Sequence, residues 1–180
     1  MGSAFEFVGG AAVGLAAHET GHLIFDWAFD ARPRIEGVRA GPFPFFAISH
    51  DSGLPPRQEF TISSAGFWMQ HAGSEWLLTR RPGLRHETAP FQKGLLAFDM
   101  VASAVYAGAA FAQSGPVERD TRGMADALGI AEPWVGAMLL GPAVLDSYRY
   151  FHPEARWAKW ASRGVKIGLV FLVFKAPHQP

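Results

Sequence analysis

An apolar run near the start of the chain, which also carries ionisable side chains, most constrains the fold. From Ala4 to Phe29 the sequence is almost continuously apolar, and as a helix this segment is long enough to cross a bilayer. Within it lies the segment His18-Glu19-Thr20-Gly21-His22. Helix positions four apart lie one above the other, so both histidines can present a ring nitrogen to one metal ion. Glu19 is then the expected catalytic base.

The alternative is a pair of surface histidines beside an unrelated glutamate. The apolar flanks of the motif count against this alternative, because an unpaired carboxylate in apolar surroundings costs free energy. An aspartate, Asp26, lies four residues after His22 and so continues the four-residue step from His18 to His22. It lies more than a turn beyond the midpoint of the two histidines, so we expect it to support a metal ligand from behind rather than to bind the metal.

Charge and cysteine content exclude several classes of protein. Acidic and basic residues balance at 16 each, whereas a nucleic-acid-binding protein normally has a clustered basic surplus. We therefore expect no nucleic-acid partner. The chain has no cysteine, so any metal must be held by His, Asp or Glu. Charged residues make up 18% of the chain, below the usual quarter, which is typical of a membrane protein or of a very apolar helical bundle.

The pattern of apolar segments predicts a mainly α fold, a polytopic membrane helix bundle with about four spanning segments in a single domain, 1–180. After the first span, the expected spans are Phe60 to Leu78, Gly94 to Ala112, and a run that begins at Trp134 and is kinked or interrupted at Gly141-Pro142. Residues 118–132 are polar and predict a short surface helix. Residues 34–48 predict a short β-hairpin or edge strand after the first helix, with a plain connecting loop as the alternative.

A catalytic zinc ion normally takes three protein ligands, so the two histidines need one more. The residues just after the motif offer none, and the ligand must come from further along the chain. The candidates in apolar settings are His71, Glu75, Asp99 and Asp146.

The order of these motifs resembles the site-2 protease family of intramembrane zinc metalloproteases. That family has H-E-x-G-H on a transmembrane helix, then a strand-forming stretch ending near Gly-Pro, as in Arg34 to Ala40 followed by Gly41-Pro42. Its Ala-Gly-Pro-x-x-Asn element is similar to Ala65-Gly66-Phe67-Trp68-Met69-Gln70. Its Leu-Asp-Gly element, often followed by Arg, is similar to Leu145-Asp146-Ser147-Tyr148-Arg149.

The resemblance implies that Asp146 is the third zinc ligand and that Gln70 binds the substrate backbone or the oxyanion. Asp99 is the rival as ligand or as a residue that supports a ligand histidine. The chain departs from the family at Phe67, Gln70 and Ser147, where the family has Pro, Asn and Gly. It therefore resembles a divergent, minimal member.

From these features we expect a zinc-dependent intramembrane endopeptidase that cleaves membrane-associated polypeptides with a metal-activated water. Its expected partners are the lipid bilayer and a membrane-protein or peptide substrate, and its expected location is a bacterial-type inner or plasma membrane. Two alternatives stay open. One is a metal-binding membrane protein that does not cleave and acts as a binding or regulatory partner. The other is a soluble zinc hydrolase with a buried helical bundle.

Overall fold

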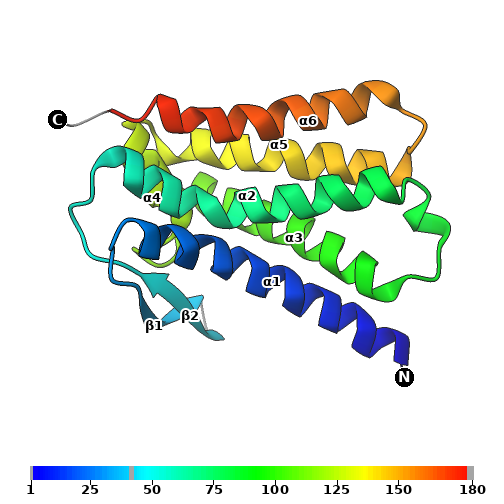
Figure 1. Ribbon diagram of the computed structural model, residues 1–180, viewed down its shortest axis with the longest axis horizontal. Helices are drawn as coiled ribbons and strands as arrows, with labels where there is room; N and C mark the ends of the chain where they lie inside the picture. The colour runs from blue at the N-terminus through cyan, green and yellow to red at the C-terminus, as the bar shows by residue number, and fades with distance from the viewer. Residues whose placement is uncertain (1, 41–42, 178–180) are drawn as a thin grey trace.

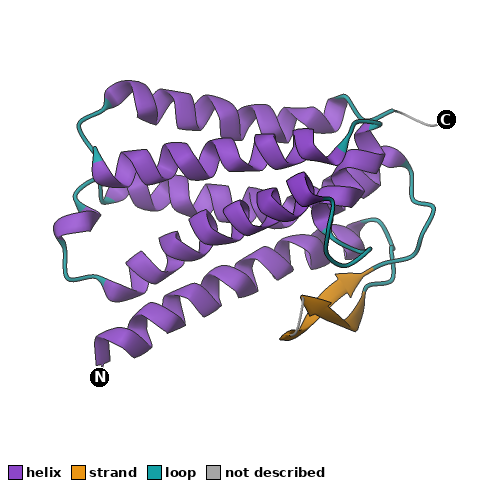
Figure 2. Ribbon diagram, turned by 180° about the vertical axis from the view of Figure 1, so that it is seen from behind, coloured by secondary structure: helices purple, strands orange, loops and turns teal. Residues whose placement is uncertain are grey.

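The computed structural model describes residues 2–40 and 43–177, which form a helical bundle with a small hairpin at one side (Figures 1 and 2). In chain order its elements are α1 (Gly2–Ala28), β1 (Arg34–Ala40), β2 (Phe43–Ser49), α2 (Pro56–Arg80), α3 (Pro90–Ala112), α4 (Asp120–Leu128), α5 (Glu132–Phe151) and α6 (Arg156–Phe171). Short 3₁₀ turns lie at Leu84–His86 and Leu172–Phe174. The mainly helical fold with a two-stranded sheet confirms this part of the prediction.

Prolines and left-handed residues mark several helix boundaries. Pro56 and Pro90 begin α2 and α3, at a position where the backbone N–H that proline lacks has no partner within the helix. Gln113 follows α3 with φ 49°, and Gly129 follows α4 with φ 65°. These left-handed residues end the helices and reverse the chain, since their N–H groups cap the last carbonyls.

Glycines allow α1 and α3 to pack closely. A Cβ atom added to Gly10 would lie 1.9 Å from the backbone oxygen of Phe91, and one added to Gly94 would lie 1.9 Å from that of Phe7. No side chain fits between the two backbones at either place. The small residues in the two apolar segments therefore fix where α1 crosses α3.

A hairpin follows α1, which is one of the alternatives predicted for residues 34–48. Strands β1 and β2 pair in an antiparallel manner, with Arg34 opposite Ser49 and Ala40 opposite Phe43. Gly41-Pro42, expected to end the first strand, lies outside the described residues. The hairpin lies beside the C-terminal end of α1 (Figure 2).

Apolar residues are buried in two clusters at different levels of the bundle. One joins α2, α4 and α5 and is built on Phe60, Phe67, Met124, Val135 and Leu139. The other lies around the connection from α2 to α3 and includes Leu77, Leu78, Leu84, Ala89 and Leu96. Many ionisable side chains are also buried, and they form the two polar groups described in the next subsection.

The expected membrane spans are matched only in part. Among the described residues, α3 alone is long and apolar enough to cross a membrane by itself. Helices α4 and α5, which meet at an angle of 118°, pass the same test only as a pair. The count of about four spans is therefore not confirmed. Of the kink or interruption predicted at Gly141-Pro142, the interruption does not occur, because α5 continues as one helix through Pro142.

Candidate metal centre

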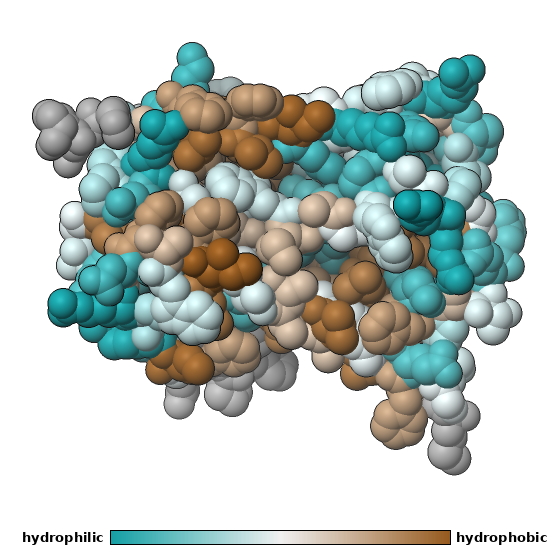
Figure 3. All heavy atoms as spheres, in the orientation of Figure 1, coloured by the Kyte–Doolittle hydropathy of each residue, from teal (hydrophilic) through white to brown (hydrophobic). Residues whose placement is uncertain are grey.

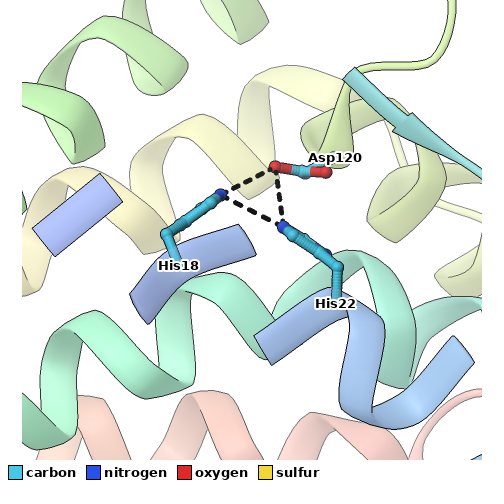
Figure 4. Close-up of side chains that lie close together, drawn as sticks. All are labelled: His18, His22 and Asp120. Atoms are coloured by element: carbon cyan, nitrogen blue, oxygen red, sulfur yellow. Dashed lines mark hydrogen bonds and ion pairs between the residues drawn. The ribbon is translucent and has the colours of Figure 1, made fainter. Parts of the chain in front are cut away.

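Two histidines and one aspartate meet in the interior near the C-terminal half of α1 (Figure 4). The Nε2 atoms of His18 and His22 lie 3.1 Å apart. Asp120, in the first turn of α4, places its Oδ2 atom 3.3 Å from Nε2 of His18 and 3.5 Å from Nε2 of His22. Both histidines are buried, with 2% and 5% of their surface exposed. Among the described residues, these three form the one group of His, Asp and Glu that could share a metal ion.

The spacing of the three atoms fits a tetrahedral zinc site. Zinc binds imidazole nitrogen and carboxylate oxygen at about 2.0–2.2 Å, so two ligand atoms on a tetrahedron lie roughly 3.3–3.5 Å apart. The three observed separations are 3.1, 3.3 and 3.5 Å. His18, His22 and Asp120 can therefore hold a zinc ion with little movement of their side chains.

Hydrogen bonds at Nδ1 of each ring orient the two rings so that their Nε2 atoms face each other. Nδ1 of His18 donates to Oε1 of Gln70, and Nδ1 of His22 donates to the backbone oxygen of Ile62 at 2.8 Å. A neutral imidazole that donates through Nδ1 carries a lone pair on Nε2. Two such lone pairs 3.1 Å apart repel each other unless a proton or a metal ion lies between them.

The glycine within the motif lets α2 approach the histidines. A Cβ atom on Gly21 would lie 2.7 Å from the backbone oxygen of Ala65. A Cβ atom on Gly66 would lie 2.6 Å from ring atoms of both His18 and His22. The Ala65-Gly66 pair is thus the surface on which the two imidazole rings rest. Its closeness brings Ile62 and Gln70 of α2 within hydrogen-bonding distance of the rings.

Asp120 is held in place by its two neighbours in the chain. Arg119 donates from Nε and Nη2 to the two carboxylate oxygens of Glu132, at 2.6 and 2.5 Å. Thr121 donates to the same carboxylate at 2.6 Å. Because Glu132 begins α5, these bonds fasten the first turn of α4 to the next helix. Asp120 lies between the two fastened residues and therefore faces α1.

The charge on Asp120 suits a metal ligand. Burial alone would raise the pKa of its carboxyl group, but in the absence of a metal ion the positive charge of a protonated His22 ring and hydrogen bonds from His18 and His22 hold that pKa well below the ordinary value. The group is therefore ionised at neutral pH, as coordination requires.

An apolar cavity of about 890 Å³ opens beside the three residues. Glu19 lines it together with His18, His22 and Asp120, so the expected base and the candidate ligands face one space. The walls are mainly apolar side chains of α1, α3 and β2, among them Phe7, Leu15, Ile48, Phe98, Val101 and Val105. From Phe7 to His22, α1 rises by about 22 Å, so the cavity can hold an extended apolar chain that ends at the candidate ligands.

Asp146, the expected third ligand, lies elsewhere, and this prediction is corrected. Its carboxylate lies 2.6 Å from Nζ of Lys166 and accepts hydrogen bonds from Ser162 at 2.6 Å and Ser74 at 2.8 Å. Arg149 lies 3.3 Å away and also pairs with Glu75. Asp146 therefore belongs to a buried ionic network of α2, α5 and α6, and neither Asp146 nor Glu75 is grouped with the motif's histidines.

The other predicted site residues support His18 or lie apart from it. Gln70 uses its oxygen for His18 and donates from Nε2 to Oδ1 of Asp99 at 3.5 Å. With both ends of its amide engaged, Gln70 does not face the cavity as the expected oxyanion donor would. Asp99 also lies 3.3 Å from Nδ1 of His71, so neither is a ligand here. Asp26 lies apart from the site, 3.4 Å from Nδ1 of His50.

Sequence reasoning missed Asp120 because its segment is polar and resembles a solvated surface helix. The helix is present, but its first turn faces inward. The signal that could have found it is the Arg119-Asp120-Thr121 triplet followed by Glu132. Arg119 can form an ion pair with Glu132, which leaves the carboxylate of Asp120 without that partner.

Comparisons with protein-family models, with curated proteins and with solved structures found no match to this chain.

Proposed function

We propose that this protein is a zinc-dependent endopeptidase that hydrolyses apolar polypeptides at or within a membrane. The observation that carries the proposal is the meeting of the two Nε2 atoms at 3.1 Å with Oδ2 of Asp120 within 3.5 Å of both, a group that could share one metal ion. When bound there, zinc supplies a Lewis acid that polarises a carbonyl group and makes a nearby water more acidic.

Glu19 is the residue of this chain that moves the proton. It lines the same cavity as the ligands but is not one of them. Its carboxylate accepts a proton from the attacking water as the water oxygen bonds to the carbonyl carbon. It then gives that proton to the nitrogen of the leaving amine as the C–N bond breaks. His18, His22 and Asp120 would hold the metal ion and would transfer no proton.

The cavity supports a polypeptide substrate that is apolar and extended. A stretch of about 22 Å accommodates roughly six to seven residues of extended chain, at about 3.3 Å per residue. Phe46 and Ile48 of β2 line the same cavity, so the hairpin lies where such a chain would pass. Pairing of the substrate with a strand edge is one means of holding it open for cleavage.

The distribution of polar and apolar side chains supports a membrane location. Large apolar residues are exposed along α1, α2, α5 and α6, including Val8, Trp76, Trp134, Trp160 and Phe171, each at least 60% exposed. Hydrophobic patches lie between hydrophilic side chains on the face drawn in Figure 3. The buried side chains include the charged groups of Asp99, Asp146, Arg149 and Lys166. Exposed apolar surface around a polar interior is typical of helices in a bilayer.

A soluble zinc hydrolase is a second candidate, favoured by the finding that, in the described part of the chain, only α3 is by itself apolar and long enough to span. Extraction separates the two. A membrane protein stays with the membrane fraction after washing at high salt and alkaline pH and is released by detergent, whereas a soluble hydrolase enters the buffer.

The enzymatic proposal is tested with detergent-purified protein and a fluorescent peptide that contains one apolar segment. We expect cleavage that stops on chelation and returns with zinc. Glu19→Gln should bind zinc as the wild type does and cleave at least about 100-fold more slowly. Glu154→Gln, which alters an exposed carboxylate that does not line the cavity, is the control and should retain activity. Zinc binding with no cleavage by the wild type would favour a binding or regulatory partner.

A further inference from the structure

A polar chain continues behind His18, away from the cavity. His18 donates from Nδ1 to the amide oxygen of Gln70, and the amide nitrogen of Gln70 donates to Oδ1 of Asp99 at 3.5 Å. All three side chains are at least 95% buried, so no bulk water competes for these positions. The chain joins α1, α2 and α3 in sequence.

The charge of Asp99 decides which way the amide of Gln70 points. An ionised carboxylate only accepts hydrogen bonds, so it favours the NH₂ end of the amide and repels the oxygen end. The oxygen must then face His18, where it accepts a hydrogen bond only if Nδ1 carries the proton. With the proton on Nδ1, Nε2 keeps its lone pair and can bind metal.

We propose that Asp99 is a positioning residue that acts through Gln70 to hold His18 in its metal-binding tautomer. The inference rests on the proposed metal centre, because the tautomer matters only if Nε2 is a ligand. It gives Asp99 a different role from that of a ligand, and Gln70 a different role from that of an oxyanion donor. His71 also faces Asp99, with Nδ1 at 3.3 Å, and provides a further polar neighbour for the carboxylate.

Asp99→Asn tests the proposal with almost no change in volume. The amide that this substitution introduces can donate a hydrogen bond, so the amide of Gln70 is free to turn its oxygen toward position 99 and its NH₂ toward His18. In the turned orientation His18 Nδ1 accepts, and the proton moves to Nε2. We expect zinc affinity to fall roughly 10–100-fold, the usual effect of removing a group that orients a ligand.

Moving the negative charge from position 99 to position 70 distinguishes a loss of positioning from a general loss of structure. In the double variant Gln70→Glu/Asp99→Asn, the new carboxylate at position 70 can accept from the new amide at position 99 and from His18 Nδ1 together. We expect it to regain zinc affinity to within about threefold of the wild type, a difference of less than ~1 kcal/mol. Ser103→Ala is the control, since Ser103 is fully buried on the same helix, one turn beyond Asp99, and its hydroxyl has no hydrogen-bond partner among the described residues.

The direct readout is the ¹⁵N spectrum of labelled histidine in metal-free protein, with His18 assigned by difference from a His18→Gln variant. Wild type and the double variant should show the proton on Nδ1, and Asp99→Asn should show a measurable share of it on Nε2. The proposal is overturned if Asp99→Asn keeps the wild-type tautomer, or if the double variant fails to restore it. Because this readout needs neither zinc nor cleavage, its failure is distinct from failure of the proposed function.

Discussion

Oδ2 of Asp120 lies 3.3 Å from Nε2 of His18, although 102 residues separate them in the chain. The contact depends on two structural features, the close packing of α1 on α2 and the hydrogen bonds that hold α4 to α5. Glycines at 21 and 66 let α1 and α2 meet so closely that the rings rest on backbone, and the bonds of Arg119 and Thr121 to Glu132 hold the first turn of α4 against them. Each feature can be disrupted by a single substitution, and each substitution has a control on a nearby residue.

Gly66→Ala should disturb the site and the fold together. The new methyl group would lie 2.6 Å from atoms of both imidazole rings, so the rings or α2 must shift. Overpacking of this kind typically costs about 1–3 kcal/mol. We therefore expect a lower melting temperature and weaker zinc binding, measured by thermal unfolding and by chelator competition.

The control for this prediction is Gly73→Ala on the same helix, where an added Cβ atom meets nothing within 4 Å. It should leave zinc binding unchanged and raise stability by up to about 1 kcal/mol, because alanine is the better helix former. Equal effects of the two substitutions would show that the approach at Gly66 is not the cause.

Glu132→Gln should loosen Asp120 without touching a ligand. The substitution removes the charge that binds Arg119 through two hydrogen bonds, and a largely buried Arg is left poorly paired. We expect zinc affinity to fall about tenfold. Arg122→Gln is the control, because Arg122 lies on α4 with Asp120 but pairs with Asp126. That pair is exposed, its charged atoms lie 3.7 Å apart, and it contributes little to stability. If zinc affinity is unaffected by Glu132→Gln, Asp120 is positioned by other contacts.

The pair of His50 and Glu59 predicts a pH dependence of stability. The hydrogen bond to Glu59, at 3.0 Å, raises the pKa of His50 above its ordinary 6.5, although burial opposes the shift. Burial would raise the pKa of Glu59, but the bond from His50 lowers it below its ordinary 4.5. Stability from His50 is thus complete below pH 6.5 and is lost as the pH rises through the folded-state pKa.

The contribution from Glu59 has the opposite sense, being present above pH 4.5 and lost as the pH falls through the lowered pKa. The pair therefore stabilises the fold most between these limits. Thermal unfolding of wild type and His50→Gln across roughly pH 4 to 9 measures the difference. A difference that does not change with pH would contradict this assignment.

Local patterns in the sequence predicted most of the fold, for physical reasons that individual residues illustrate. The four-residue step from His18 to His22 is set by helix geometry, so their meeting needs no tertiary information. A hairpin was one of the alternatives predicted for residues 34–48, and the helices were predicted from the apolar runs Phe60 to Leu78 and Gly94 to Ala112. The break expected at Pro142 did not occur, because α5 continues through a buried proline.

The third candidate ligand could not be predicted in this way, because it depends on which acid finds a cationic partner. Asp146 has an apolar setting in the sequence, but Lys166 and Arg149 neutralise it in the fold. Asp120 has a polar setting, but its neighbours Arg119 and Thr121 are occupied by Glu132. The carboxylate whose basic neighbour pairs with another acid is the one left for a metal ion, and only the three-dimensional arrangement distinguishes Asp120 from Asp146.

The most direct measurement is the zinc content of purified wild-type, Asp120→Asn and Asp146→Asn proteins, each equilibrated with the same buffered zinc concentration. Both substitutions keep the volume of the side chain and remove its charge. We predict that the wild type and Asp146→Asn bind equal amounts of zinc at the motif's histidines, with Asp146→Asn less stable, and that Asp120→Asn binds at least about tenfold more weakly. Full zinc binding by Asp120→Asn together with its loss in Asp146→Asn would contradict the account.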